Sequence, residues 1–277
     1  MEKTSKSKII ILIIFLLVIA VATFFLWKGI AKFNRIMAEK EEISSYNELS
    51  EEAFGSTEPH ETIPLPGQSV EVEKIPRKKP DPRPSMLDFA TLQEEYPDMV
   101  GWIKCKDTLI DYPIMQGEDN DFYLHHLYNG KEGANGSIFM DWLNHPDFYD
   151  CNSILYGHNM ASGQMFHSIN GYKFQHYYDT FPTMQLFTPY GDYTVSLIAG
   201  FIYSKEADIN VEFLDCADDE RVVEYIDWAK SVSTFNSPET VQADDRLVTL
   251  VTCTYEYENA RYVLHGKLIP TDFNNPA

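Results

Sequence analysis

The sequence has only four cysteines, at Cys105, Cys151, Cys216 and Cys253, and no Cys-x-x-Cys pair. Zinc sites and dithiol redox sites usually need cysteines at that close spacing, so the pattern argues against both. We therefore expect no metal and no cofactor. An exported chain could form disulfides, but if Cys253 has to be free, the other three cysteines cannot all pair within the chain.

Basic residues are also scarce, with 22 Lys and Arg against 42 Asp and Glu and a net charge of −20. Residues 1–84 are balanced, so the acidic excess lies in residues 85–277, where ten basic residues face thirty acidic ones. Binding to nucleic acid requires clustered positive charge, and this composition argues against a nucleic-acid partner.

Long hydrophobic runs are rare, and the clearest covers residues 9–27, nineteen positions without a charge. As a helix this run would span about 28 Å, close to the roughly 30 Å of a bilayer core. A cleavable signal peptide would be shorter and followed by small residues, whereas Trp27 and Lys28 follow here. We expect an uncleaved, single-pass membrane anchor. Basic residues flank both sides equally, but the short amino end favours a cytoplasmic amino terminus and an extracellular main domain.

The composition divides the chain into three parts: a cytoplasmic stub with the anchor at 1–30, a stalk rich in proline and charge at 31–84, and one globular domain at 85–277. Turn residues recur through this domain between short runs of β-forming residues, which favours a β-barrel or β-sandwich decorated by helices. The expected strands cover 108–113, 136–140, 153–156, 184–188, 193–203, 247–253 and 261–269, and the expected helices lie near 87–92, 98–102, 164–169, 172–178 and 218–232.

Cys253 ends one expected strand, and Arg261 begins the next after a polar connection. In an antiparallel hairpin the last residue of one strand faces the first residue of the other, so the two side chains should be neighbours at one rim of the sheet. A guanidinium keeps its proton and biases a nearby thiol toward the thiolate, the nucleophilic form. This pair is the clearest chemical signal in the sequence.

His158 lies where a short buried strand gives way to a loop after Gly157, a position suited to an acid or base. Of the eight histidines, His265 is its main rival, since it shares a strand face with Arg261. It would nevertheless lie about 13 Å further along that strand, too far to exchange a proton with Cys253. Cys253, His158 and Arg261 are the candidate nucleophile, acid/base and oxyanion-stabilising residues, and we find no Asp or Asn positioned to orient His158.

These residues resemble the sortases, cysteine transpeptidases of Gram-positive cell surfaces, and the finer motifs are similar to class B. The resemblance covers roughly residues 85–269. Besides the Tyr-Gly-His turn ending at His158 and the Thr-Cys pair ending at Cys253, the matching segments are 110–113 (Ile-Asp-Tyr-Pro), 119–124 (Asp-Asn-Asp-Phe-Tyr-Leu), 136–141 (Gly-Ser-Ile-Phe-Met-Asp) and 261–266 (Arg-Tyr-Val-Leu-His-Gly).

The resemblance implies a closed barrel of seven to eight strands with N-terminal helices and a long, helix-containing connection between the sixth and seventh strands. It implies that the enzyme cleaves a C-terminal sorting motif of exported surface proteins after Thr, through a thioester, and transfers the protein to an amine of a lipid-linked peptidoglycan precursor or of a pilin. It also suggests four residues of the substrate groove: Asn120, Leu124, Tyr156 and Thr252. Class B members commonly carry Ser where this chain has Val251, and an acidic residue where it has Thr254.

Three alternatives remain open from the sequence. A pilus-polymerising sortase would share the same motifs. A cysteine endopeptidase would use water as the acceptor, although the papain order, with Cys before His, does not apply here. A third possibility is an inactive wall-binding or pilus-scaffold module that keeps the barrel only for recognition.

Overall fold

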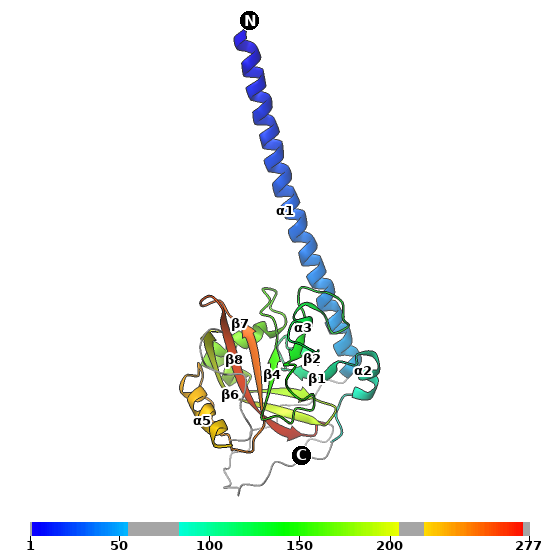
Figure 1. Cartoon of the computed structure of the whole chain (residues 1–277), viewed down its shortest axis with the longest axis vertical. Helices are drawn as coiled ribbons and strands as arrows, with labels where there is room; N and C mark the ends of the chain where they lie inside the picture. Colours follow the sequence, from blue (N-terminus) through cyan, green and yellow to red (C-terminus); the bar gives the residue numbers. More distant parts are fainter. Residues whose placement is uncertain (1, 55–82, 205–218, 274–277) are drawn as a thin grey trace. The chain divides into compact units, whose positions relative to one another are not determined.

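The computed structural model describes residues 2–54, 83–204 and 219–273, without the side chains of residues 2–20, 22 and 219–221. Eight strands in this described part close into a barrel, in the order β1-β2-β3-β4-β7-β8-β6-β5 (Figure 1). The strands are β1 (Met99–Lys104), β2 (Asp111–Met115), β3 (Ile138–Met140), β4 (Asn152–Tyr156), β5 (Thr183–Phe187), β6 (Asp192–Ser204), β7 (Leu247–Cys253) and β8 (Ala260–Thr271). The predicted closed β-barrel is confirmed.

Two strand pairs, β2 with β3 and β4 with β7, are parallel, and the other pairs are antiparallel. The pairing of β4 with β7 matters most for function, because parallel strands end at the same edge of a sheet. The carboxyl ends of β4 and β7 therefore lie side by side, although nearly one hundred residues separate them in the sequence. Four of the predicted site residues end or follow these two strands: Tyr156, His158, Thr252 and Cys253.

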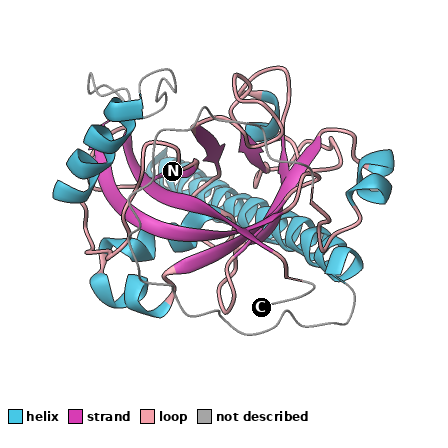
Figure 2. Cartoon of the chain, turned by 90° about the horizontal axis from the view of Figure 1, so that it is seen from below, coloured by secondary structure: helices cyan, strands magenta, loops and turns pink. Residues whose placement is uncertain are grey.

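Short helices surround the barrel (Figure 2). They are α2 (Phe89–Glu95), α3 (Phe122–His125), the 3-10 helix η1 (Phe166–Lys173), α4 (Gln175–Thr180) and α5 (Asp219–Ser231). The helix α5 belongs to the long connection between β6 and β7, as expected, and packs against β6. Its buried residues Val222, Ile226 and Ala229 recur at helical spacing and cover the outer face of the barrel.

The barrel interior is filled by large apolar side chains such as Trp102, Phe166 and Tyr262, all fully buried. Strand β7 is buried along nearly its whole length and β8 from Tyr262 to Gly266, since one face points into the barrel and the other lies under α5. Burial on both faces accounts for the almost continuous apolar sequence of β7 and makes its register strongly specified. This rigid scaffold holds the residues at the ends of the strands.

The helix expected near residues 98–102 is wrong: residues 99–102 belong to the strand β1, which pairs with β2 and β5. The segment is apolar on both faces and too short for periodicity to separate a buried strand from a helix. The preceding helix α2 is capped by Asp88, whose side chain accepts from the Thr91 N–H. The Ser85 hydroxyl, three residues earlier, donates to Asp192 Oδ1 at 2.5 Å.

The helix α1 (Glu2–Phe54) extends across two compact units, Met1–Ser45 and Tyr46–Ala277. The barrel unit therefore begins earlier than position 85, where the sequence-based domain division starts. At the carboxyl end of α1, Tyr46, Leu49 and Phe54 are buried in the barrel core. The Phe54 ring lies edge-on to Trp102, with centroids 5.6 Å apart.

The predicted membrane anchor at residues 9–27 falls within α1. Most of its side chains lie outside the described residues. Within the portion of the chain that could be searched, no helix combines the length and the hydropathy needed to cross a membrane.

Candidate active site

Cys253 and Arg261 face each other across the β7–β8 hairpin. The register pairs them directly, one position after Thr252 pairs with Tyr262. The hairpin predicted from the sequence is therefore confirmed, with Cys253 at the last position of β7 and Arg261 at the second position of β8.

Two hydrogen bonds join Gly157, at the start of the loop that carries His158, to the end of β7. After the last parallel pair, the Gly157 N–H donates to Val251 O at 3.2 Å, and the Thr252 hydroxyl donates to Gly157 O at 2.7 Å. A Cβ atom at Gly157 would lie 2.4 Å from the Ile138 side chain and 2.7 Å from the Phe166 ring, so a residue without a side chain fits this turn best. The turn brings His158 and Cys253 to the same edge of the barrel.

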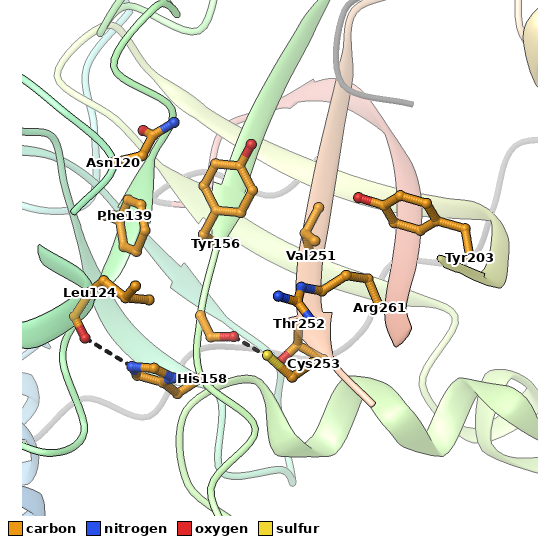
Figure 3. Close-up of a pocket in the computed structure, with 11 residues that line it drawn as sticks. Asn120, Leu124, Phe139, Tyr156, His158, Tyr203, Val251, Thr252, Cys253 and Arg261 are labelled. Atoms are coloured by element: carbon orange, nitrogen blue, oxygen red, sulfur yellow. Dashed lines mark hydrogen bonds between the residues drawn. The ribbon is translucent and has the colours of Figure 1, made fainter. Parts of the chain in front are cut away.

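The imidazole of His158 is oriented by a backbone carbonyl. Its Nε2 lies 2.8 Å from Leu124 O, and a carbonyl can only accept, so Nε2 carries a proton. The basic nitrogen of the neutral ring is then Nδ1, on the opposite edge, which Figure 3 shows turned toward the side of Cys253. The orienting group that the sequence did not reveal is thus the main chain at Leu124.

All seven site residues predicted from the sequence line one cavity of about 340 Å³ (Figure 3). The predicted residues are Asn120, Leu124, Tyr156, His158, Thr252, Cys253 and Arg261, and the lining is completed by Phe139, Gly157, Tyr203 and Val251. Of the four additional residues, Gly157 had been noted in the sequence as a turn residue and Val251 as a departure from the class B pattern. Phe139 belongs to the matching segment 136–141 but was not selected for the site, and Tyr203 looks like an ordinary strand residue.

One wall of the cavity is organised by Asp141, a buried carboxylate that sequence reasoning did not select. Its Oδ2 accepts from Asn120 Nδ2 and from the Tyr156 hydroxyl, each at 2.9 Å. The Asn120 Oδ1 in turn accepts from the Trp142 N–H at 3.0 Å. Both ends of the Asn120 amide are therefore fixed, and the Tyr156 ring is held against the Phe139 ring at a centroid distance of 5.3 Å.

Thr252 lines the cavity, but its hydroxyl is already engaged. The side chain is 2% exposed, and its single hydroxyl proton is donated to Gly157 O. The hydroxyl of Thr252 therefore supports the loop that carries His158.

Arg261 has donors to spare. Its Nη1 donates to Ala260 O at 3.1 Å, and within the described residues it forms no ion pair. A guanidinium carries five N–H donors, so most of them are available to a ligand in the cavity. The described contacts therefore do not support a structural role for Arg261 in a surface ion pair.

The Cys253 backbone is held by Asn159, another residue that sequence reasoning missed. The Asn159 side-chain amide donates to Cys253 O at 2.8 Å, two positions beyond the Gly157–Val251 bond on each chain. It continues the parallel ladder after the backbones have separated. Its Oδ1 lies 2.7 Å from His167 Nδ1, which therefore carries a proton.

The rival residues lie away from the cavity. His265 is fully buried between Thr249 Oγ1 at 2.8 Å and the Tyr225 hydroxyl at 3.1 Å, and burial lowers its pKa to about 3. Cys105 is a free, buried thiol whose pKa is raised to about 11 by burial. Cys151 is disulfide-bonded, while Cys216 lies outside the described residues.

Replacing Gly136 with alanine should disturb the support of His158. Gly136 has a φ of +56°, and a Cβ there would lie 2.5 Å from Leu124 O, the carbonyl that orients the imidazole. We expect the variant to lose more than about 2 kcal/mol of unfolding free energy, because a strained φ and a clash with backbone combine. Urea unfolding and peptide turnover measure the two consequences.

Gly130→Ala is the matched control, since Gly130 also has a positive φ, of +75°, but open space where a Cβ atom would be added. It should lose only about 1 kcal/mol and keep its turnover. Equal losses of stability and activity in the two variants would contradict the role given to the Gly136–Leu124 contact.

Sequence relatives and solved structures that resemble this chain belong to the same family. No family model matches the chain. A sortase B of Listeria monocytogenes is 40% identical over 187 residues, which are 66% of this chain and 74% of that protein. The crystal structure of Staphylococcus aureus sortase B matches with a TM-score of 0.62 at 30% identity, covering 66% of this chain and 87% of that one. Sortase B of Bacillus anthracis, solved in complex with AAEK1, matches with a TM-score of 0.67 at 26% identity, covering 85% and 100%.

The eight-stranded mixed barrel, the cavity at the ends of β4 and β7, and the identity to curated relatives agree with one another. Surface proteins with a sorting signal are the substrates of this family. The chain belongs to the sortase B family of cysteine transpeptidases.

Proposed function

We propose that the chain cleaves the C-terminal sorting motif of exported surface proteins after a threonine and transfers the protein to an amine. The observation that carries this proposal is the shared cavity of about 340 Å³, which is lined by a thiol, an imidazole and a guanidinium. In this proposal Cys253 is the nucleophile, His158 the acid and base, and Arg261 the oxyanion-stabilising group.

In the first half-reaction the Cys253 thiolate adds to the carbonyl carbon of the threonine. A C–S bond forms, and the carbonyl electron pair moves onto oxygen, where the Arg261 N–H groups donate to the developing charge. When this tetrahedral intermediate collapses, the C–N bond breaks. The protonated His158 gives its Nδ1 proton to the leaving amine, and a thioester to Cys253 remains.

In the second half-reaction an amine attacks the thioester carbonyl. A new C–N bond forms, the C–S bond breaks, and the amine proton passes to His158 as Cys253 leaves as a thiolate. The acceptor is an amine of the lipid-linked peptidoglycan precursor. A pilin amine would use the same chemistry and give a pilus polymer instead.

The sorting peptide lies, in this proposal, against the wall formed by Asn120, Leu124 and Tyr156. The support is the rigidity of this wall, since Asp141 fixes both Asn120 and Tyr156. A wall whose polar groups are already oriented loses little entropy when a peptide binds. Thr252 contributes to the shape of the cavity through its buried position, with its hydroxyl engaged at Gly157.

We also propose that residues 9–27 anchor the chain in the membrane, with the catalytic unit on the extracellular side. The support is the uncharged nineteen-residue run in the sequence. Both substrates of a cell-wall transpeptidase arrive at the extracellular face of the cell membrane. An anchor that holds the enzyme there would raise their local concentration around the cavity.

The experiment that tests the function separates transfer from hydrolysis. The full-length chain, purified in detergent, is incubated with a peptide that carries a C-terminal sorting signal from an exported protein of the same organism, with and without triglycine. Triglycine is a suitable amine because one solved sortase B structure is a complex with this tripeptide. Mass spectrometry then distinguishes the amide product from the free acid.

We expect cleavage after Thr with an amide product that grows with the triglycine concentration. Acid alone at every triglycine concentration would favour a cysteine endopeptidase. No cleavage at all, with an intact fold, would favour a recognition module without catalysis.

A further inference from the structure

The carbonyl that orients His158 belongs to a helix of a single turn. Leu124, whose oxygen lies 2.8 Å from His158 Nε2, is part of α3, which is only four residues long (Figure 3). So short a helix has little stability of its own. It lies against β3, and the Tyr123 hydroxyl ties it to Asp98 Oδ2 at 2.7 Å. The position of the imidazole therefore depends on the contacts that hold α3 to the barrel.

Ser137 holds α3 from the side of the barrel. It is buried and directly precedes β3. Its backbone N–H donates to Tyr123 O at 2.9 Å, and its hydroxyl donates to His126 O at 2.9 Å. These two carbonyls come before and after Leu124 in the sequence. Ser137 therefore fixes the short segment that presents the Leu124 carbonyl to the imidazole.

The hydroxyl of Tyr46, near the carboxyl end of α1, reaches the same turn. It donates to Gly136 O at 2.6 Å and lies 3.2 Å from Ser137 Oγ. Burial raises the pKa of Tyr46 well above its ordinary value, so the hydroxyl keeps its proton. The ring packs against the rings of Tyr112 and Tyr128, with centroids 5.4 and 5.0 Å away. A phenylalanine at this position would keep these ring contacts and lose only the hydroxyl.

We propose that Tyr46 is a positioning residue for His158. Its hydroxyl fixes the turn at Gly136 and Ser137, this turn holds α3, and α3 presents the Leu124 carbonyl to the imidazole. The inference rests on the proposed function, in which His158 is the acid and base. Tyr46 does not line the catalytic cavity and acts only through these groups. The catalytic unit therefore includes a residue that precedes the proline-rich stretch.

Loss of the Tyr46 hydroxyl should disturb proton transfer. The hydrogen bond to the Leu124 carbonyl keeps the proton of the neutral imidazole on Nε2 and leaves Nδ1 as the basic atom. If α3 shifts, this bond weakens, and the ring also populates the form with its proton on Nδ1. That form cannot accept a proton at Nδ1. The effect should be partial, because the Tyr123 hydroxyl still ties α3 to Asp98.

The first measurement is the steady-state kinetics of the full-length chain and its Tyr46→Phe variant, with a sorting-signal peptide and triglycine. We expect kcat to fall by about fivefold to tenfold, since a displacement of about 1 Å at a catalytic group can cost up to about 10²-fold. KM should stay within about twofold, because Asp141, and not Tyr46, holds the wall proposed for the sorting peptide.

The second measurement reports the imidazole without any turnover. Nitrogen NMR spectra of the chain labelled with ¹⁵N-histidine, recorded at alkaline pH where the rings are neutral, distinguish a proton on Nε2 from one on Nδ1. The spectrum of a His158→Gln variant identifies the signals of His158. The unmodified chain should show the Nε2–H form alone, and Tyr46→Phe should show a mixture of the two forms.

Tyr178→Phe is the matched control. Tyr178 is also buried, and its hydroxyl donates to Ser237 Oγ at 3.0 Å, with neither residue lining the catalytic cavity. This variant should lower the melting temperature about as much as Tyr46→Phe but leave kcat and the His158 signals unchanged. An equal loss of kcat in the two variants would overturn the inference, because it would reflect a general loss of stability.

Ser137→Ala tests the next step of the same path, because it removes the hydrogen bond to His126 O. It should lower kcat by a similar factor, and the double variant with Tyr46→Phe should lose less than the product of the two single losses, since both act through α3. Unchanged kcat and an Nε2–H form alone in both single variants would overturn the inference and leave the proposed function standing. Absence of turnover in the unmodified chain would instead overturn the proposed function, while the spectra would still show whether Tyr46 orients His158.

Discussion

Replacing Cys253 with alanine should lower kcat/KM for a sorting-signal peptide by at least about 10³-fold. The thioester cannot form without the sulfur, and no other cysteine lines the described cavity. The Cys253 side chain lies at the end of β7 and is only partly buried, so its loss should change the melting temperature little. Peptide turnover followed by chromatography measures the effect.

Cys105→Ala provides the control for this prediction. Cys105 is the other free cysteine of the described chain, but it lies in the core and its pKa is raised to about 11 by burial. Its removal should cost some stability and leave turnover per folded molecule unchanged. If Cys253→Ala kept its turnover, or if Cys105→Ala lost it without unfolding, the assignment of the nucleophile would be wrong.

Replacing Arg261 with alanine should lower kcat by about 10²- to 10³-fold with a smaller effect on KM. This is the size expected when a donor to a developing oxyanion is removed, since that contact strengthens only in the transition state. Arg261→Lys should recover only part of the loss, because an ammonium keeps the charge but lacks the planar set of donors. Steady-state kinetics on the sorting-signal peptide separate kcat from KM.

Lys267→Gln is the matched control on the same strand. It removes one positive charge from β8, where Lys267 pairs with Glu239 and Asp245 away from the cavity. Its kcat should stay within about twofold. A similar loss of kcat in Lys267→Gln would mean that general charge, and not the position of Arg261, matters for catalysis.

The sequence predicted the central geometry because local signals defined it. A hairpin between two β-rich runs sets the register from the connection alone, and the structure pairs Cys253 with Arg261 as expected. The strand of Cys253 was predicted with its observed bounds, 247–253, because burial on both faces leaves a continuous apolar run with clear ends. The helix α5 was equally readable from its spaced apolar residues.

The missed features depend on contacts that leave no trace in residue type. The carbonyl that orients His158 belongs to Leu124, and every residue has such a carbonyl. Asn159 is a polar loop residue without periodic context, and its bond to Cys253 O needs the two strand ends to be neighbours. For β1, a short and mostly apolar segment fits a buried strand as well as a short helix, and only the pairing with β2 and β5 decides.

The residue at which the barrel unit begins was also hard to predict from the sequence. Tyr46, Leu49 and Phe54 lie in a helix that the sequence suggested as the start of a stalk, and a proline-rich stretch separates them from the barrel strands. Their apolar spacing is a weak signal over so few turns. Burial of all three in the barrel core is a tertiary effect that composition does not reveal.

The most direct test of the account is to trap the acylated enzyme during turnover and to locate the acyl group by mass spectrometry. The full-length chain is mixed with a sorting-signal peptide, quenched in acid within the first turnovers, and digested for mass spectrometry. The account predicts an added acyl fragment that ends in threonine, attached to the peptide containing Cys253 and released by hydroxylamine. Cleavage of the donor with no such adduct, or an adduct on any other residue, would contradict it.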